Sequence, residues 1–333
     1  MRRMIKLAGS YCVAGIAAMA TLLAASGPAA TANEDAKYRL IFAMDLSPND
    51  AWTRAARFFA DTVKEKSDGR ITITVHDSGT LGAQRQALEG ILAGVVHGTM
   101  ATEPLSYWVE DINLYGIPYL FQDQDHLSRF LESVSGQELH QKLIDAGFRP
   151  LTYFNRPPRH ITSNRPIESL ADLKGLKIRV PESATAPAAF RAMGAAPVTM
   201  NFSELYSALE TGVLDAQENP LTSTFFNKLH EVQKNIAYTS HQYQVGYMIF
   251  SEHTLQQMSE GDRAIVLEAA QAAKAYEASL IAEVMKSIEG DLSAAGVTFT
   301  HPDVSAFAAA AAEAYSGYSP LMQDWIKKVQ EQR

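Results

Sequence analysis

Arg179 is the side chain of this sequence best suited to hold an anion. It lies in residues 176–180, a short apolar run that predicts a strand, and Pro181 follows directly. Alternation along a strand sets Arg179 on the face opposite its apolar neighbours. A guanidinium is planar and always charged, and it matches a carboxylate with two parallel hydrogen bonds. Because a buried arginine is costly without a partner, it pairs either with a ligand or with an acid of the chain, Asp215 or Glu218.

Three further side chains lie at the ends of neighbouring predicted elements. Asn219 ends a predicted strand before Pro220, and its amide either binds a carboxylate or caps the turn. Arg159 follows two adjacent prolines and, taken alone, is expected on the surface. Phe202 begins a helix in N-F-S-E, which predicts a capping box, and it either walls a cleft or packs in the core. Ligands of open α/β sheets bind at the carboxyl ends of strands, so these ends form the candidate site.

Strand and helix patterns alternate along the chain, which predicts an α/β fold. The predicted strands are residues 38–44, 71–75, 95–101, 151–154, 176–180, 196–200, 245–250 and 297–301, with a further strand ending at Asn219. The predicted helices are residues 52–67, 84–93 and 259–294, two short helices within 126–147 separated at Gly136, residues 221–230, and one or two helices within 304–332.

Two segments of the chain resemble each other. Residues 91–104 and 208–220 each contain a helix end, a Gly-Val step, a short strand and a polar stop before proline. This similarity predicts two related lobes. Adjacent prolines do not fit inside a helix or a central strand, so residues 155–160 predict a first crossing between lobes. Residues 245–250 predict the second crossing.

The composition indicates an exported globular protein. The chain has 333 residues, a net charge of −8 and 47% hydrophobic residues, which suggests about two domains of ~150 residues. A basic start, an apolar run over 7–25 and the small residues Ala30-Thr31-Ala32 predict a signal peptide cleaved near Ala32, with a membrane anchor as the alternative. Cleavage would remove the only cysteine. The acidic balance argues against nucleic acid as a partner.

The sequence carries no recognisable catalytic motif. Neither a G-x-S-x-G elbow nor a phosphate-binding or dinucleotide-binding glycine loop occurs. His230-Glu231 begins like a zinc-protease helix, but position 234 is lysine, and the nine histidines lack metal-ligand spacing. We therefore expect no enzyme activity, no metal and no cofactor.

Motifs around the candidate site give the chain a family resemblance. It resembles the periplasmic solute-binding proteins of TRAP (tripartite ATP-independent periplasmic) transporters, the C4-dicarboxylate-binding-protein family. The motifs D-L-K-G-L-K-I-R-V-P, F-S-E-L-Y-S-A-L-E-T-G and G-V-L-D-A-Q-E-N-P carry the resemblance, which covers nearly all of the chain after the signal segment. It implies a two-lobe periplasmic-binding-protein fold of the α/β class, with a hinge and a long helix, residues 259–294, spanning both lobes.

The resemblance also implies roles for individual residues. Arg179 would bind the ligand carboxylate with two hydrogen bonds, Asn219 and Arg159 would assist it, and Phe202 would stack on the ligand. The opposite wall would come from three loops, with the candidates Asp45, Gln84, Arg85, Thr102 and Glu103. Gln86 stands where many relatives have glutamate, in the part of the site where relatives differ most.

The implied function is capture of an organic acid anion and its delivery to the membrane permease of a TRAP transporter. The acceptor-rich wall favours a sugar acid or hydroxy acid over a C4-dicarboxylate, which needs a second cation from Arg85 or a moved Arg159. The expected lobes are residues 36–156 plus 245–284 and residues 157–244 plus 285–333, acting as a monomer in the periplasm. An exported enzyme and a sensor subunit on a similar fold are the alternatives from other classes.

Overall fold

A computed structural model of the protein describes residues 36–332. The expected signal peptide, residues 1–32, lies outside the described residues. Within residues 36–332, no helix is both long enough and apolar enough to cross a bilayer.

The first sheet contains five strands in the order β2-β1-β3-β10-β4. Its strands are β1 (Tyr38–Ala43), β2 (Ile71–His76), β3 (Gly98–Ala101), β4 (Phe148–Asn155) and β10 (Val245–Ser251). β1 is parallel to β2 and β3, whereas β10 is antiparallel to β3 and β4.

The second sheet repeats this arrangement. Its order is β11-β9-β5-β8-β6-β7, with β5 (Arg159–Ser163), β6 (Lys177–Val180), β7 (Ala196–Thr199), β8 (Ala216–Pro220), β9 (Asn235–Gln242) and β11 (Thr298–Thr300). β6 is parallel to β7 and β8, and β5 is antiparallel to β8 and β9. β1, β3 and β10 therefore correspond to β6, β8 and β5. The expectation of two related lobes is confirmed, and the matching segments 91–104 and 208–220 contain β3 and β8.

The chain crosses between the sheets at two short connections. Arg156, Pro157 and Pro158 join β4 of the first sheet to β5 of the second, as the adjacent prolines predict. Tyr243 and Gln244 join β9 back to β10.

Helices cover both faces of the first sheet. On one face α1 (Ala51–Lys66) and α10 (Glu260–Val284) pack on Phe42, Met248 and other residues of alternate strand positions. On the other face lie α2 (Gln84–Leu92), α3 (Gln124–Glu132), α4 (Val134–Asp145) and the C-terminal α13 (Pro320–Gln330). The burial of alternate residues on opposite faces follows from the period-2 geometry of a strand.

The second sheet packs against α5 (Ala186–Ala192) and α12 (Val304–Ala312). α6 (Phe202–Glu210) forms a smaller cluster with α8 (Leu229–Val232), and α7 (Leu221–Phe226) packs with α11 (Ile288–Ala294). The remaining helices are α9 (Glu252–Gln257) and the 3₁₀ segments η1 (Glu103–Tyr107), η2 (Glu110–Gly116), η3 (Leu170–Leu173) and η4 (Tyr315–Gly317).

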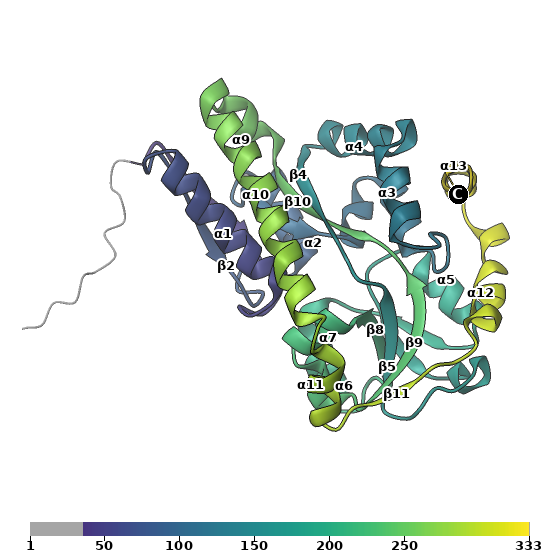
Figure 1. Ribbon diagram of the computed structural model, residues 1–333. Coiled ribbons are helices and arrows are strands. Elements are labelled where there is room, and N and C mark those ends of the chain that lie inside the picture. The colour runs from purple at the N-terminus through teal and green to yellow at the C-terminus, as the bar shows by residue number, and fades with distance from the viewer. Residues whose placement is uncertain (1–35, 333) are drawn as a thin grey trace, which may run out of the picture. The chain divides into compact units, whose positions relative to one another are not determined.

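The long helix α10 contacts both cores. Its residues Val266, Ala269 and Ala273 are buried against the first sheet, and Figure 1 shows α10 lying along α1. At its other end, Val284 packs against the cluster that joins α7 and α11 to Ile236 of the second sheet. The two-lobe α/β fold with a long spanning helix is thus the observed architecture.

Five local predictions were wrong. The helix expected over 221–230 is divided into α7 and α8, and the second crossing expected at 245–250 lies at residues 243–244, before β10. The expected helix over 259–294 is interrupted at residues 285–287, where α10 ends and α11 begins. Gly136 lies inside the first turn of α4 instead of between two helices. The capping box at N-F-S-E does not form, because the Asn201 side chain makes no cap hydrogen bond and donates to Glu204 instead, at 3.5 Å.

Gly246 in β10 gives a testable consequence of this packing. A Cβ at this position would lie 2.2 Å from the ring of Trp52, whereas one at Gly261 in α10 would meet nothing within 4 Å. We expect Gly246→Ala to lower the free energy of unfolding by about 1–3 kcal/mol through overpacking. Gly261→Ala is the matched control, and we expect no loss or a gain of up to about 1 kcal/mol from helix propensity. Urea unfolding of both variants tests this, and equal effects would contradict it.

Candidate functional site

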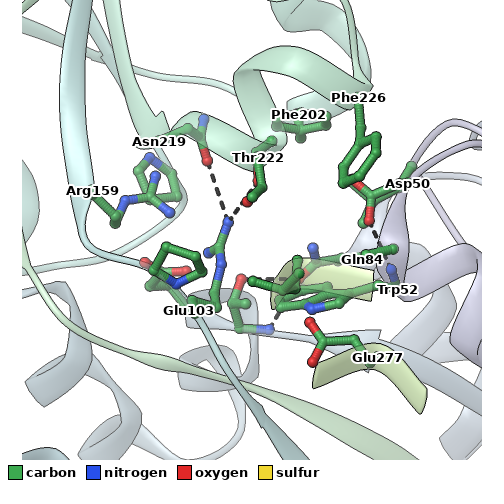
Figure 2. A pocket seen from close by; sticks show the side chains of 18 of the residues that line it. Asp50, Trp52, Gln84, Glu103, Arg159, Phe202, Asn219, Thr222, Phe226 and Glu277 are labelled. Carbon is green, nitrogen blue, oxygen red and sulfur yellow. Dashed lines mark hydrogen bonds between the residues drawn. The ribbon is translucent and has the colours of Figure 1, made fainter. Parts of the chain in front are cut away.

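A cavity lies where the carboxyl ends of corresponding strands of the two sheets meet. Glu103 follows β3 of the first sheet, and Arg179 and Asn219 lie in β6 and β8 of the second. An adjoining hollow adds Asp45, which follows β1. The strand ends of both lobes therefore supply the site, as expected for open α/β sheets. Figure 2 shows the main cavity, and its polar and aromatic lining includes Asp50, Trp52, Gln84, Thr102, Glu103, Arg156, Arg159, Arg179, Phe202, Asn219, Thr222, Ser223, Phe226 and Glu277.

Arg179 is buried, and most of the hydrogen-bonding capacity of its guanidinium group is available to the cavity. Its Nε donates to the carbonyl of Met200 at 2.8 Å, and its guanidinium carbon lies 5.9 Å from the ring centroid of Phe202. Burial lowers the pKa of Arg179 to about 10, so the group is charged at neutral pH. Within residues 36–332, Arg179 forms no ion pair. The two proposed partners within the chain are engaged elsewhere: Glu218 with Arg159, and Asp215 with the backbone N–H of Lys177 at 3.0 Å.

Arg159 is held by Glu218. Its Nε donates to Glu218 Oε2, and one terminal nitrogen donates to Oε1 at 2.7 Å and to the Glu218 carbonyl at 2.6 Å. Burial alone would raise the pKa of the Glu218 carboxyl group. Arg159 and the His241 side chain, 3.0 Å away, outweigh burial and lower this pKa to about 2. The surface position expected for Arg159 alone was wrong, since only 2% of this residue is exposed. Arg159 therefore lines the cavity, and the Glu218 carboxylate neutralises much of its charge.

Arg156 is a third cavity arginine that the sequence reading missed. It lies in the first crossing, and its Nη2 donates to Asn219 Oδ1 at 3.4 Å and to Ser223 Oγ at 3.3 Å. The guanidinium carbon lies 4.9 Å from the ring centroid of Trp52. Burial and the charge of Arg159 lower the pKa of Arg156 to about 10. The signal that could have found Arg156 is the crossing itself, because a segment that joins two lobes must pass beside the space between them.

Asn219 does not cap the helix that follows it. Its amide nitrogen donates to Gln217 Oε1 at 2.6 Å, while its oxygen accepts from Arg156. The N-cap of α7 is Pro220, which has no capping side chain. Asn219 is therefore oriented by polar neighbours within the cavity wall.

The opposite wall is rich in hydrogen-bond acceptors. Gln84 Oε1 accepts from the backbone N–H and the hydroxyl of Thr102, at 3.1 and 3.2 Å. The Gln84 amide nitrogen donates a hydrogen bond to the Asp45 carboxyl group. Burial raises the pKa of Asp45 to about 6, although this hydrogen bond acts to lower it. Glu103 is buried, and Gln242 donates to it at 3.3 Å. Asp45, Gln84, Thr102, Phe202 and Arg179 together line the adjoining hollow.

Arg85 lies apart from this group. Its side chain is 39% exposed, pairs with Glu89 at 3.3 Å and lies over the ring of Tyr107. It lines neither the cavity nor the adjoining hollow. The loop before α2 thus contributes Gln84 to the cavity and directs Arg85 away from it.

A hydrogen-bonded bridge joins the two sides of the cavity. Ser47, after β1, donates its N–H to Asn227 Oδ1 and its hydroxyl to the Phe226 carbonyl, both at 3.1 Å. Asn227 donates in turn to Asp50 at 2.8 Å. Asp50 also caps α1 by accepting from the N–H of Trp52 at 2.9 Å. We call these residues, 47, 50, 226 and 227, the 47–227 bridge.

The arrangement is suited to binding an anion. The guanidinium groups converge on one side, and amide, hydroxyl and carboxylate oxygens lie on the other. Among the residues that the structure describes, no group of His, Cys, Asp and Glu side chains could hold a metal ion.

Comparison with known proteins identifies the family. The model of the family named bacterial extracellular solute-binding protein, family 7, matches residues 42–320. A solute-binding protein of Roseobacter denitrificans is 34% identical over 303 residues, which cover 91% of this chain and 92% of that protein.

Solved structures agree with this assignment. A TRAP periplasmic solute-binding protein from Roseobacter denitrificans, with bound L-galactonate, superimposes with a TM-score of 0.84 at 33% identity, covering 89% of this chain and 99% of that one. One from Sulfurospirillum deleyianum, with bound succinate, has a TM-score of 0.83 at 30% identity, covering 90% and 100%. One from a Polaromonas species, bound to D-erythronate, has a TM-score of 0.83 at 27% identity, covering 88% and 98%.

The sheet order, the cavity between strand ends and these matches agree: the chain belongs to family 7 of the bacterial extracellular solute-binding proteins, whose solved members include the TRAP periplasmic solute-binding proteins.

Proposed function

We propose that this protein captures a polyhydroxy monocarboxylate, a sugar acid or hydroxy acid, with Arg179 as the main carboxylate ligand. The observation that carries the proposal is the buried guanidinium of Arg179, whose only hydrogen bond to residues 36–332 uses Nε. Its two terminal nitrogens have the geometry for a carboxylate. Asn219, Arg159 and Phe202 complete this side of the cavity.

The far wall supports a hydroxylated ligand. Asp45, Gln84, Thr102 and Glu103 offer acceptors and donors that match hydroxyl groups. A second carboxylate placed here would meet the charges of Glu103 and Asp50. L-galactonate and D-erythronate, bound by two of the similar proteins, belong to the proposed class.

One observation favours a second candidate, a C4-dicarboxylate. The sequence offered only Arg85 or a moved Arg159 as the second cation, whereas the cavity contains Arg156. A short dicarboxylate that bridges Arg179 and Arg156 would satisfy both charges. Succinate is the ligand in the Sulfurospirillum protein.

Closure of the two lobes around the ligand is the proposed mechanism of capture. The lobes are residues 36–156 plus 245–284 and residues 157–244 plus 285–333, with hinge connections at 156–158 and 243–244. The packing of α13 favours one change to this division. Trp325 donates to Asp111 at 2.7 Å within the first core, so residues 320–330 would move with the first lobe.

The proposed partner of the loaded protein is the membrane permease of a TRAP transporter, in the periplasm. We infer that the protein acts as a monomer and carries out no reaction. Genes for two membrane subunits beside this one would separate transport from a sensor role, and turnover of a bound acid would reveal an enzyme.

The ligand class can be tested by thermal unfolding of the purified protein with a panel of acids. The panel contains L-galactonate, D-galacturonate, D-erythronate and succinate, with the uncharged sugar galactose as a control. A ligand at 100 times its Kd adds about 2.7 kcal/mol to the free energy of unfolding. We expect the largest shift from a polyhydroxy acid. A larger shift from succinate would favour the dicarboxylate, and a shift from galactose alone would overturn the carboxylate proposal.

Arg179→Ala tests the carboxylate ligand directly. Removing one member of a buried ion pair typically costs about 3–5 kcal/mol, so we expect affinity for the bound acid to fall by more than ~100-fold. Arg85→Ala is the matched control, because this arginine lies outside the cavity, and its affinity should stay within about twofold. Calorimetric titration measures both variants. Equal affinities of the two variants would refute the role of Arg179.

A further inference from the structure

We propose that Glu277 is an additional ligand-binding residue, which hydrogen-bonds a hydroxyl group of a polyhydroxy acid whose carboxylate lies at Arg179. This inference rests on the proposed function and deepens it. Glu277 lies on α10 and lines the cavity, where Figure 2 shows it beside Trp52. Only 2% of the residue is exposed, and its Oε1 has no hydrogen-bond partner in residues 36–332.

An unpartnered buried carboxyl oxygen is costly, so its persistence calls for a physical account. The Trp52 side chain hydrogen-bonds the Glu277 carboxyl group, and Oε1 is the oxygen left without a partner in residues 36–332. Each carboxyl oxygen of Asp50 accepts a hydrogen bond from another group, one from the N–H of Trp52 and one from Asn227. The guanidinium of Arg156 is directed to Asn219 and Ser223. One turn before Glu277, Lys274 places its Nζ 3.5 Å from the ring centroid of Tyr153. A ligand group in the cavity is the proposed partner of Oε1.

The surroundings select the chemical class of that group. Burial, with the charge of Asp50, raises the pKa of Glu277 to about 8, although Trp52, Arg156 and Lys274 act in the opposite direction. At neutral pH the group is therefore mainly a neutral carboxylic acid, which both donates and accepts as a hydroxyl does. A second ligand carboxylate would be repelled by Asp50.

The position of Glu277 also explains why the sequence did not reveal it. It is one of several glutamates in an alanine-rich helix, and helical spacing alone does not show which of them is buried. The helix lies along the first sheet, and only its final turns, from Glu277 to Ile281, reach the cavity.

Substitution of Glu277 tests the proposal. We expect Glu277→Leu to weaken binding of L-galactonate, D-galacturonate or D-erythronate, whichever bind the wild type, by about ten- to a hundred-fold, the effect of leaving a buried hydroxyl unpaired. Glu277→Gln keeps a donor and an acceptor at the site, and we expect a loss of less than about fivefold. Calorimetric titration at pH 7 gives the three affinities.

A glutamate on the same helix provides the matched control. The Glu283 side chain is 75% exposed and pairs with Lys286, so Glu283→Leu should leave affinity within about twofold of the wild type. If polyhydroxy acids bind and Glu277→Leu binds them as tightly as the wild type does, this inference fails while the proposed function stands. If no polyhydroxy acid binds the wild-type protein, both fail.

Stability of the ligand-free protein separates a binding role from a structural one. The pKa of Glu277 is raised from 4.5 to about 8 in the folded protein, so folding takes up a proton between these values and stability falls as the pH rises through them. Glu277→Gln lacks this titration. We expect the wild type to lose stability relative to Glu277→Gln from pH 5 to pH 8, and Glu277→Leu to melt higher than the wild type at pH 8. A lower melting temperature of Glu277→Leu at pH 8 would show that Glu277 stabilises the ligand-free fold, through Trp52 or another protein group, and would overturn the inference.

Discussion

Guanidinium groups that share one cavity repel one another, and each loses hydration that must be replaced. The three arginines of this cavity receive different compensation. Arg159 is paired in full with Glu218, whose second contact is His241. Arg156 has neutral partners, Asn219 and Ser223, and the face of Trp52. Arg179 receives one carbonyl. The compensation of the positive charge decreases from Arg159 to Arg156 to Arg179. A ligand carboxylate is therefore most stabilising at Arg179.

The duplicated sheet order makes this concentration of charge possible. β6 and β8 of the second sheet correspond to β1 and β3 of the first, and their carboxyl ends bring cations from one lobe and acceptors from the other to one cavity. Neither sheet is built from one continuous segment, because the chain crosses between the sheets through residues 156–158, through residues 243–244, and again along α10 and α11 between β10 and β11. The crossing is also part of the site, since Arg156 belongs to it and binds Asn219 of the second lobe.

Much of the architecture follows from local sequence patterns, whereas the site depends on contacts between distant segments. Alternation and helical spacing identified most strands, the adjacent prolines identified the first crossing, and the repeated Gly-Val step identified the related lobes. The family motifs indicated Arg179, Asn219 and Phe202, which line the cavity together. The partner of each arginine was not predictable, because Glu218 lies near both Arg159 and Arg179 in the sheet and only the packed structure shows which one it binds. Glu277 was missed for a similar reason: its burial arises from the packing of α10 on both cores.

The 47–227 bridge contributes to the affinity of the protein for its ligands but not to its specificity among them. Its hydrogen bonds join groups of the protein, and Ser47 and Asn227 lie outside the cavity lining, so these bonds add the same free energy to every complex in which the two sides of the cavity meet. Specificity is a difference between affinities, and a uniform contribution cancels from it. Changes at Ser47 or Asn227 during evolution could therefore shift the concentration range over which the protein responds while leaving the order of preference among acids intact. The order itself is set by the cavity wall.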